Sequence, residues 1–170
     1  TFSILSNGSF SNDNLESYSN AIGDIDNDGY PEIVVSNSNN DDLFLWKNLT
    51  NMSNNWLKVK LEGTTSNKQG VGSTIEISVD GQKQYRYTLC GEGYLGQNSA
   101  YEFFGLGSNT TIDYIKVSWL SGIQDIFYDI NVNQTLSIEE GSSTLGIEDF
   151  NDYNIHIHPN PVNDYLYFDI

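Results

Sequence analysis

The stretch Gly23–Ile33, GDIDNDGYPEI, is the part of this chain whose residue spacing demands a particular chemistry. Asp24, Asp26 and Asp28 alternate along it, and Glu32 adds a carboxylate four residues after Asp28. Carboxylates spaced in this way repel one another unless a cation lies between them, and Ca²⁺ takes about six to eight oxygen ligands in proteins. The pattern therefore predicts a calcium loop. The alternative is a solvated acidic turn.

Two further residues complete the predicted loop. Gly29 lies where the chain must turn sharply, and the backbone carbonyl of Tyr30 is the expected main-chain ligand. The predicted metal ligands are thus Asp24, Asp26, Asp28, Tyr30 and Glu32. The loop begins like an EF-hand, but an EF-hand has a glutamate at its twelfth position, where this chain has Val35, and a helix on each side. The β-branched run 33–35 predicts a strand instead.

Composition limits the classes of function. The 170 residues include 7 basic and 23 acidic side chains, for a formal net charge of −16. This excess of acid argues against nucleic acid as a partner, because phosphates require a basic surface. No apolar run reaches the roughly 18 residues of a membrane-spanning helix. The chain has neither an initiator methionine nor an export signal, and we expect it to be an internal fragment of a longer exported protein.

Short alternating runs predict an all-β chain. They are separated by Gly, Asn, Asp and Ser at intervals of about 8–12 residues, and no segment predicts a helix. Up to residue 51 the predicted strands are 2–5, 18–22, 33–36 and 43–47. Beyond it they are 56–61, 75–79, 84–89, 101–107, 115–119, 124–128 and 134–139.

The N-terminal part resembles a known repeat. With Glu32 as the ligand at the ninth position, the acidic loop is similar to the calcium loop of FG-GAP/VCBS repeats, the blade units of integrin-like β-propellers. The run 43–48, LFLWKN, resembles the strand that closes such a unit. Repeat units need neighbours to bury their faces, and only one calcium loop is present. We therefore expect residues 1–52 to be the terminal part of a propeller that lies mostly upstream.

Residues 53–141 resemble a second family. Between residues 55 and 141 the chain shows N-x-W-L-x-V-x-L-x-G, S-N-K-x-G-x-G, G-x-G-Y-L-x-Q, F-G-L-G, V-x-W-x-S-G and N-Q-x-L-x-I-x-E-G in this order. This succession looks like the ASPIC/UnbV domain of proteins similar to cartilage acidic protein, which follows FG-GAP/VCBS repeats in that family. The resemblance implies an antiparallel β-sandwich. The chain departs from the pattern at Gly96, where serine is more common, and at Lys68, where arginine is usual.

The C-terminal residues suggest a route of export. A polar linker, 142–154, precedes the segment 155–167 (IHIHPNPVNDYLY), which is similar to the start of the sorting domain of type IX secretion. This resemblance implies that 155–170 is a truncated sorting domain read by the type IX machinery. It also implies secretion by a Gram-negative bacterium and attachment at its outer membrane.

These resemblances imply a non-enzymatic, secreted or cell-surface adhesion module that binds Ca²⁺ and an extracellular protein or glycan. An alternative is an accessory carbohydrate-binding part of a polysaccharide-processing surface protein, and a third is a domain that only caps the propeller. The candidate ligand-binding residues are Tyr94, Asn67 and Gln97, and Tyr94 is favoured because it lies between glycines in a loop. The aromatic residues Tyr85, Tyr87, Tyr101, Phe103 and Phe104 are expected to serve in core or cross-strand packing rather than as a sugar platform.

Three other groups of residues do not predict catalysis. Cys90 is the only cysteine and is expected to be a small buried hydrophobe. His156 and His158 share one face of a predicted strand, where a solvent-facing pair is favoured over a transition-metal site. Several carboxylates could suggest a hydrolase, but nothing in their spacing pairs them as a glycosidase requires. They are Asp113, Asp125 and Asp129.

Overall fold

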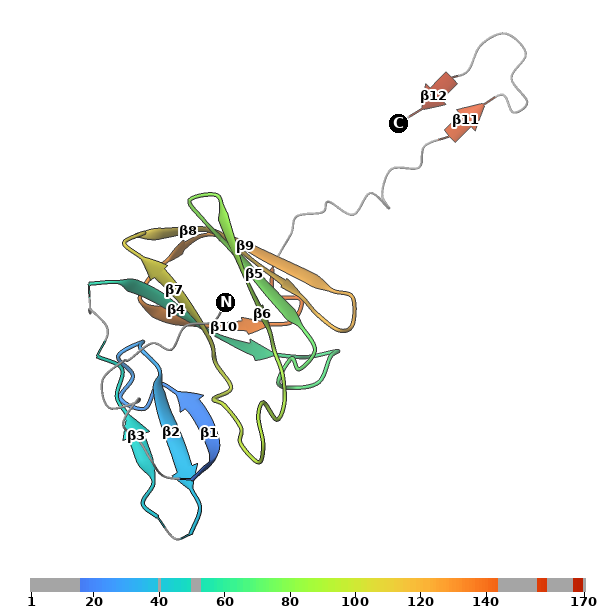
Figure 1. Ribbon diagram of the computed structural model, residues 1–170. Coiled ribbons are helices and arrows are strands. Elements are labelled where there is room, and N and C mark those ends of the chain that lie inside the picture. Colours follow the sequence, from blue (N-terminus) through green and yellow to red (C-terminus); the bar gives the residue numbers. More distant parts are fainter. Residues whose placement is uncertain (1–15, 40, 50–52, 144–155, 159–166, 170) are drawn as a thin grey trace, which may run out of the picture.

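The described part of the chain contains β-strands and no helix, which confirms the predicted all-β class (Figure 1). The computed structural model describes residues 16–39, 41–49, 53–143, 156–158 and 167–169. The predicted strand 2–5 lies outside these residues. The other predicted strands are present, and their ends lie within four residues of the predicted ends. The ends differ because pairing between strands, and not the alternation of side chains, determines where each strand begins and ends.

The N-terminal sheet has three antiparallel strands in the order β1-β2-β3 (Figure 1). They are β1 (Ser17–Gly23), β2 (Glu32–Asn37) and β3 (Phe44–Trp46). The acidic stretch 24–31 connects β1 to β2, where Gly23 pairs with Glu32. The connection thus leaves one strand and returns antiparallel to it, so that its carboxylates are gathered at one end of this sheet.

The larger unit contains two sheets. The first, in the order β10-β4-β7, consists of β4 (Asn55–Glu62), β7 (Glu102–Gly107) and β10 (Gln134–Glu139). The second, in the order β6-β5-β8-β9, consists of β5 (Thr74–Val79), β6 (Gln82–Tyr87), β8 (Thr111–Ser118) and β9 (Gln124–Asn131). Both sheets contribute to one hydrophobic core, as expected for a sandwich. Its buried members include Leu57, Val59, Leu61, Ile75, Ile77, Phe104, Ile115, Val117 and Ile138.

Strand β4 has two different faces because successive side chains in a strand point in opposite directions. Leu57, Val59 and Leu61 enter the core and are at most 4% exposed. Trp56 and Lys58 occupy the alternate positions and contact the acidic loop of the N-terminal sheet. Figure 1 shows that sheet beside the sandwich. One strand therefore both builds the core of the larger unit and supplies the surface on which the smaller one packs.

Two sequence-based expectations are wrong. The sandwich is not purely antiparallel, because β10 runs parallel to β4, with Gln134 opposite Leu57. The long connection between these strands allows this pairing, which a hairpin could not form. Cys90 is exposed rather than buried. The strand predicted to run to residue 89, directly before Cys90, ends at Tyr87, so that Cys90 lies in the following loop.

Buried carboxylates close the end of the sandwich. Glu140 accepts hydrogen bonds from the backbone N–H groups of Thr64, Thr65 and Ser66 at 2.7–2.8 Å and from the hydroxyls of Ser66 and Ser121. Burial raises the pKa of Glu140, but these donors outweigh it and bring the pKa to about 2. The carboxylate thereby ties the loop after β4 to the end of β10.

Asp125 has a comparable structural role. It is fully buried and accepts hydrogen bonds from Trp119 Nε1 at 2.6 Å and from the backbone N–H groups of Gly141 and Ser143 at 2.8 Å. Burial raises its pKa, and the hydrogen bonds from Ser143, Gly141 and Trp119 lower it below its ordinary value. The lone pairs of Asp125 are thus used to hold the chain in place.

Two short strands lie near the C-terminus. β11 (His156–His158) pairs antiparallel with β12 (Tyr167–Asp169), with Ile157 opposite Phe168. The connecting residues of the predicted sorting segment lie outside the described part of the chain. The prediction for His156 and His158 concerns side chains that the structure does not describe.

We predict that Glu140→Gln lowers the melting temperature at neutral pH. The melting temperature of the variant should also fall less than that of the wild type as the pH is lowered. The folded pKa of Glu140 lies near 2 and the ordinary value is 4.5. Its stabilising contribution is therefore complete above the ordinary value and is lost as the pH falls toward 2. Thermal melts between pH 7 and 2 test this: the wild-type and variant melting temperatures should draw together below about pH 4.5 and converge near pH 2. Curves that stay parallel would contradict the assignment.

Candidate metal centre at the junction of the two units

The acidic loop brings its carboxylates together as the sequence predicts. Ligand atoms of Asp24, Asp26 and Asp28 all lie within 4.8 Å of one another. Two residues between or after them adopt positive φ, Asn27 at 60° and Gly29 at 90°, and these conformations turn the backbone back on itself. Asparagine and glycine tolerate this region of φ better than other residues, so the turn follows directly from the local sequence.

Hydrogen bonds within the loop use some carboxylate oxygens. Asp24 accepts from the backbone N–H of Asp28 at 3.1 Å and from that of Gly29 at 2.9 Å. Asp28 Oδ1 accepts from the N–H of Tyr30 at 2.8 Å. Glu32 Oε2 accepts from the N–H of Ile25 at 2.9 Å, which places this side chain against the loop. The carboxylates are therefore held in fixed orientations by the backbone.

The remaining oxygens of two of these carboxylates have no partner. Asp28 Oδ2 and Glu32 Oε1 are buried and accept no hydrogen bond. Glu32 is only 3% exposed. A buried charged oxygen without a donor is costly, and a cation removes that cost. The donor set consists of hard carboxylate oxygens, which is the chemistry that Ca²⁺ selects. The residues present fit the predicted ion.

Lysines pair with two of the aspartates of the loop, Asp24 and Asp26. Lys47 Nζ lies 2.6 Å from Asp26 Oδ2, in a pair whose side chains are 53% and 40% exposed. The hydrogen bond from Lys47 holds the pKa of Asp26 below its ordinary value. Lys58 Nζ lies 2.6 Å from Asp24 Oδ2, and here the side chains are only 5% and 2% exposed. The second pair is buried between the two units.

Packing around the loop joins the N-terminal sheet to the sandwich. A Cβ atom on Gly29 would lie 2.0–2.3 Å from the ring of Trp56, so glycine is required for the indole to lie against the loop. The hydroxyl of Tyr30 donates a hydrogen bond to the carbonyl of Asn54. A groove of about 250 Å³ lies alongside, lined in part by Pro31, Trp56 and Phe103. The candidate metal loop is therefore part of the junction.

A second set of contacts joins β1 to the loop before β7. The N–H of Ile22 donates to Asn98 Oδ1 at 2.9 Å, and the N–H of Ser99 donates to the carbonyl of Ile22 at 2.8 Å. A Cβ on Gly96 would lie 2.4 Å from the carbonyl oxygen of Asn20. The departure from the ASPIC/UnbV pattern at Gly96 thus coincides with a close backbone approach that serine would obstruct.

The residues predicted to bind a ligand do not form one site. Asn67 uses both ends of its amide on the backbone of Val71, at 2.7 and 2.8 Å, and so closes its own loop. Tyr94 is 65% exposed and packs against Tyr18, with ring centroids 5.5 Å apart. Gln97 lines a pocket of about 30 Å³, which has room for water rather than a larger ligand.

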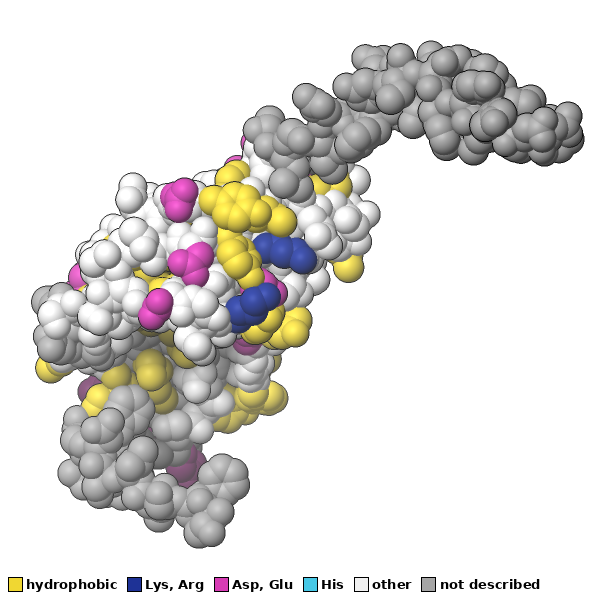
Figure 2. Space-filling model, turned by 90° about the horizontal axis from the view of Figure 1, so that it is seen from above, with side chains coloured by type: hydrophobic (Ala, Val, Ile, Leu, Met, Phe, Trp, Pro, Cys, Tyr) yellow, Lys and Arg dark blue, Asp and Glu magenta, His cyan; other side chains and the backbone are white. Residues whose placement is uncertain are grey.

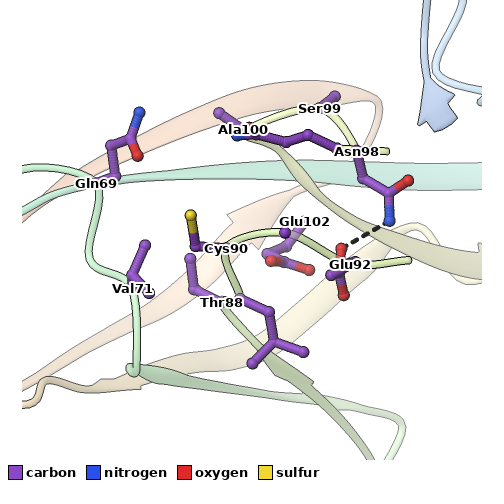
Figure 3. Close-up of a pocket in the computed structure, with 12 residues that line it drawn as sticks. Gln69, Val71, Thr88, Cys90, Glu92, Asn98, Ser99, Ala100 and Glu102 are labelled. Atoms are coloured by element: carbon purple, nitrogen blue, oxygen red, sulfur yellow. Dashed lines mark hydrogen bonds between the residues drawn. The ribbon is translucent and has the colours of Figure 1, made fainter. Parts of the chain in front are cut away.

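Figure 3 shows this small pocket, in which Asn98 Nδ2 donates to Glu92 Oε2 at 2.7 Å. Glu102 also lines it, and burial together with the charge of Glu92 raises the pKa of Glu102. Asn98 thus connects the pocket to the backbone of β1, and its position is structural.

Sequence reasoning did not identify three residues that join the sandwich to the N-terminal sheet and its candidate metal loop. They are Trp56, Lys58 and Asn98, and all lie in the sandwich. The alternation of β4 indicates that Trp56 and Lys58 leave the core, but no local pattern shows what covers that face. Their contacts join positions far apart in the chain, and residue spacing within a short segment does not predict such contacts.

Comparison with known families gives two matches. Residues 17–50 match the model of the FG-GAP repeat, and residues 63–145 match the model described as ASPIC and UnbV. The two matches occur in the order that the sequence motifs indicate, and they confirm both resemblances. Strand β4 precedes the second match but belongs to the same sandwich. No curated protein matches the chain. In the part of the chain that the structure describes, no helix is long and apolar enough to cross a membrane.

We predict that Gly29→Ala destabilises the protein more than Gly122→Ala. Both glycines have a similar positive φ, 90° and 95°, but a Cβ on Gly122 would meet nothing within 4 Å. Gly122→Ala should therefore cost only the backbone strain, roughly 1–2 kcal/mol. Gly29→Ala should add a clash with Trp56 and cost at least about 2 kcal/mol more. Urea unfolding followed by tryptophan fluorescence measures both values. Equal losses would show that Trp56 does not pack on the loop in solution.

Proposed function

Because the chain carries an FG-GAP repeat followed by an ASPIC/UnbV domain, which indicate an extracellular or surface β-rich module, we propose that it is a non-catalytic binding module that holds calcium. The observation that carries the calcium proposal is the pair of buried, unpartnered oxygens Asp28 Oδ2 and Glu32 Oε1 beside the acidic cluster. An acidic turn in solvent would leave such oxygens hydrated instead of buried.

The residues that would hold the ion are Asp24, Asp26, Asp28 and Glu32, with the carbonyl of Tyr30 as the predicted main-chain ligand. Bound there, calcium would supply positive charge to Asp28 and Glu32, the two carboxylates of the set that no lysine pairs with. The chain supplies the orientation, through the backbone N–H groups of Ile25, Asp28, Gly29 and Tyr30. We regard the ion as structural, because the loop lies at the junction and links the repeat to the sandwich.

An adhesive rather than catalytic role is supported by how the other buried carboxylates are used. Asp125 and Glu140 accept several hydrogen bonds each and hold loops in place, so that neither is free for acid–base chemistry. The groove beside Trp56 lies between the two units, where binding sites commonly occur. We propose an extracellular protein or glycan as the ligand, and export by the type IX machinery through the C-terminal segment.

We predict that millimolar Ca²⁺ raises the melting temperature of the protein relative to excess chelator. Binding to the folded state alone stabilises it by about 2.7 kcal/mol when calcium is at 100 times its Kd. Glu32→Gln should abolish this response. In chelator, however, Glu32→Gln should be at least as stable as the wild type, because the substitution removes a buried charge that no lysine pairs with, while the amide oxygen can still accept the hydrogen bond from Ile25.

The matched control is Glu62→Gln, since Glu62 is exposed and pairs only with Lys60. This variant should keep the full calcium response. A wild-type protein that melts at the same temperature in calcium and in chelator, with no heat of binding in titration calorimetry, would contradict the proposal. The loop would then be an acidic turn.

A second candidate function is carbohydrate binding, and the outer face of the sheet β6-β5-β8-β9 favours it. Tyr85 lies opposite Glu76, and Tyr114 lies opposite Tyr128, so these side chains share one face. Tyr128 is 63% exposed and Tyr85 is 47% exposed. Figure 2 shows a face of the molecule on which hydrophobic side chains lie beside basic ones. Exposed tyrosines can stack on sugar rings while their hydroxyls form hydrogen bonds.

A charged network fixes this tyrosine face. Glu76 Oε1 accepts from the hydroxyl of Tyr114 at 2.5 Å and from Lys83 Nζ at 2.9 Å. These hydrogen bonds bring the pKa of Glu76 to about 2, so the carboxylate stays charged at neutral pH. Neither Tyr114 nor Tyr128 was predicted from sequence as part of an aromatic platform.

We predict that, if this face binds glycans, Tyr128→Ala weakens retention in affinity electrophoresis by up to about tenfold. The panel consists of soluble neutral and acidic polysaccharides. Tyr94→Ala is the matched control, because Tyr94 is equally exposed but lies in a loop before β7. Retention lost with Tyr94→Ala and kept with Tyr128→Ala would move the site to the loop. No retention of the wild type on any polysaccharide would exclude this second function.

A further inference from the structure

Lys58 is the buried lysine of the junction. It lies in the middle of β4, on the face opposite the core, and its side chain is only 5% exposed. Lysine is almost never buried unless its charge is paired, because removing an ammonium group from water is expensive. Its position therefore requires a partner that compensates the charge, and in the described part of the sandwich no carboxylate forms an ion pair with it.

The partner is the first aspartate of the metal loop. Lys58 Nζ lies 2.6 Å from Asp24 Oδ2 and 3.4 Å from Asn27 Oδ1. On the sandwich side it lies 5.3 Å from the ring centroid of Trp56 and 5.6 Å from that of Tyr101, within the range of cation–π attraction. The ammonium group thus contacts the repeat through carboxylate and amide oxygens and the sandwich through aromatic faces.

The charges of the loop are then only partly compensated. Four carboxylates lie in or against it, those of Asp24, Asp26, Asp28 and Glu32, and two lysines pair with the first two. Two negative charges remain, which is the charge that one divalent ion neutralises. The unpartnered oxygens belong to Asp28 and Glu32, the carboxylates that no lysine contacts. A divalent ion would therefore share this acidic loop with Lys58, whose partner Asp24 is also among the residues proposed to hold the ion.

We propose that Lys58 is an internal counter-ion of the repeat, which holds the sandwich on the loop without calcium and lowers the affinity of the loop for calcium. This inference rests on the proposed calcium binding. The ammonium group satisfies Asp24 when the ion is absent, so the junction does not depend on metal. The same positive charge would oppose the entry of a divalent cation into the loop that carries Asp24. Docking of the sandwich and calcium binding are thus coupled through one residue.

The coupling has a direction that can be measured. Removing the charge of Lys58 leaves Asp24 buried without its cation, so the ion-free protein should become less stable. The loop then carries one more uncompensated negative charge, so calcium should bind more tightly. Even at the dielectric constant of water, two like unit charges about 4 Å apart repel by more than the thermal energy, and the charge of calcium is double.

The experiment compares wild-type protein with Lys58→Met and Lys58→Gln in the full chain. Glutamine removes the charge but can still donate a hydrogen bond to Asp24, which preserves folding if the methionine variant does not fold. Lys60→Met is the matched control, since Lys60 lies on the same strand and pairs only with the exposed Glu62. Calcium chloride titrations by calorimetry give the Kd, and thermal melts in calcium and in chelator give the stability.

We expect the Lys58 variants to bind calcium about tenfold or more tightly than the wild type. In chelator they should melt at a lower temperature than the wild type, and saturating calcium should narrow or reverse that difference. Lys60→Met should leave both quantities unchanged. Calcium binding by the wild type with equal or weaker binding by the Lys58 variants would overturn this inference alone. Absence of calcium binding in wild type and variants alike would overturn both the inference and the proposed function.

Discussion

The buried ion pair between Lys58 and Asp24 is the interaction on which the arrangement of this protein depends. It joins the middle of a core strand to the first carboxylate of the acidic loop, with both side chains removed from water. A charge in such a position must be compensated, so neither unit can leave the other without exposing or orphaning one member of the pair. The indole of Trp56 packs on Gly29, and its ring centroid lies 5.3 Å from Lys58 Nζ. This ion pair therefore joins the FG-GAP repeat to the sandwich that contains the ASPIC/UnbV match.

Much of this structure could be predicted from the sequence. The alternating apolar residues of β4 and β5 correctly indicate strands with one core-facing side, because the period of two is a local property. The spacing of Asp24, Asp26 and Asp28 likewise predicts their convergence, which the structure confirms. Here the residues that form the feature are close in sequence, and their backbone geometry alone brings them together.

The remainder depends on contacts between distant residues. Nothing around Lys58 indicates that its partner is 34 positions earlier, and nothing around Gly96 indicates the carbonyl of Asn20. Asn67 is one of the candidate ligand-binding residues, but its amide forms hydrogen bonds within its own loop. Cys90 is predicted to be buried next to a strand ending at residue 89, but the pairing of β6 with β5 ends at Tyr87 and Cys90 is exposed. For Lys58, Gly96 and the end of β6 the deciding partner is distant in sequence, whereas the partner of Asn67 lies only four residues away in the same loop.

The parallel pairing of β10 with β4 has a consequence for the order in which the chain acquires structure. The strand that receives the acidic loop has only one neighbour, β7, until residues 134–139 take their place on its other side. During synthesis from the N-terminus, the four carboxylates of the acidic loop are therefore made long before the sandwich on which they pack is complete. Contacts of such sequence separation form slowly, because the intervening loop must close first. The junction is therefore expected to assemble late, after the whole sandwich has formed.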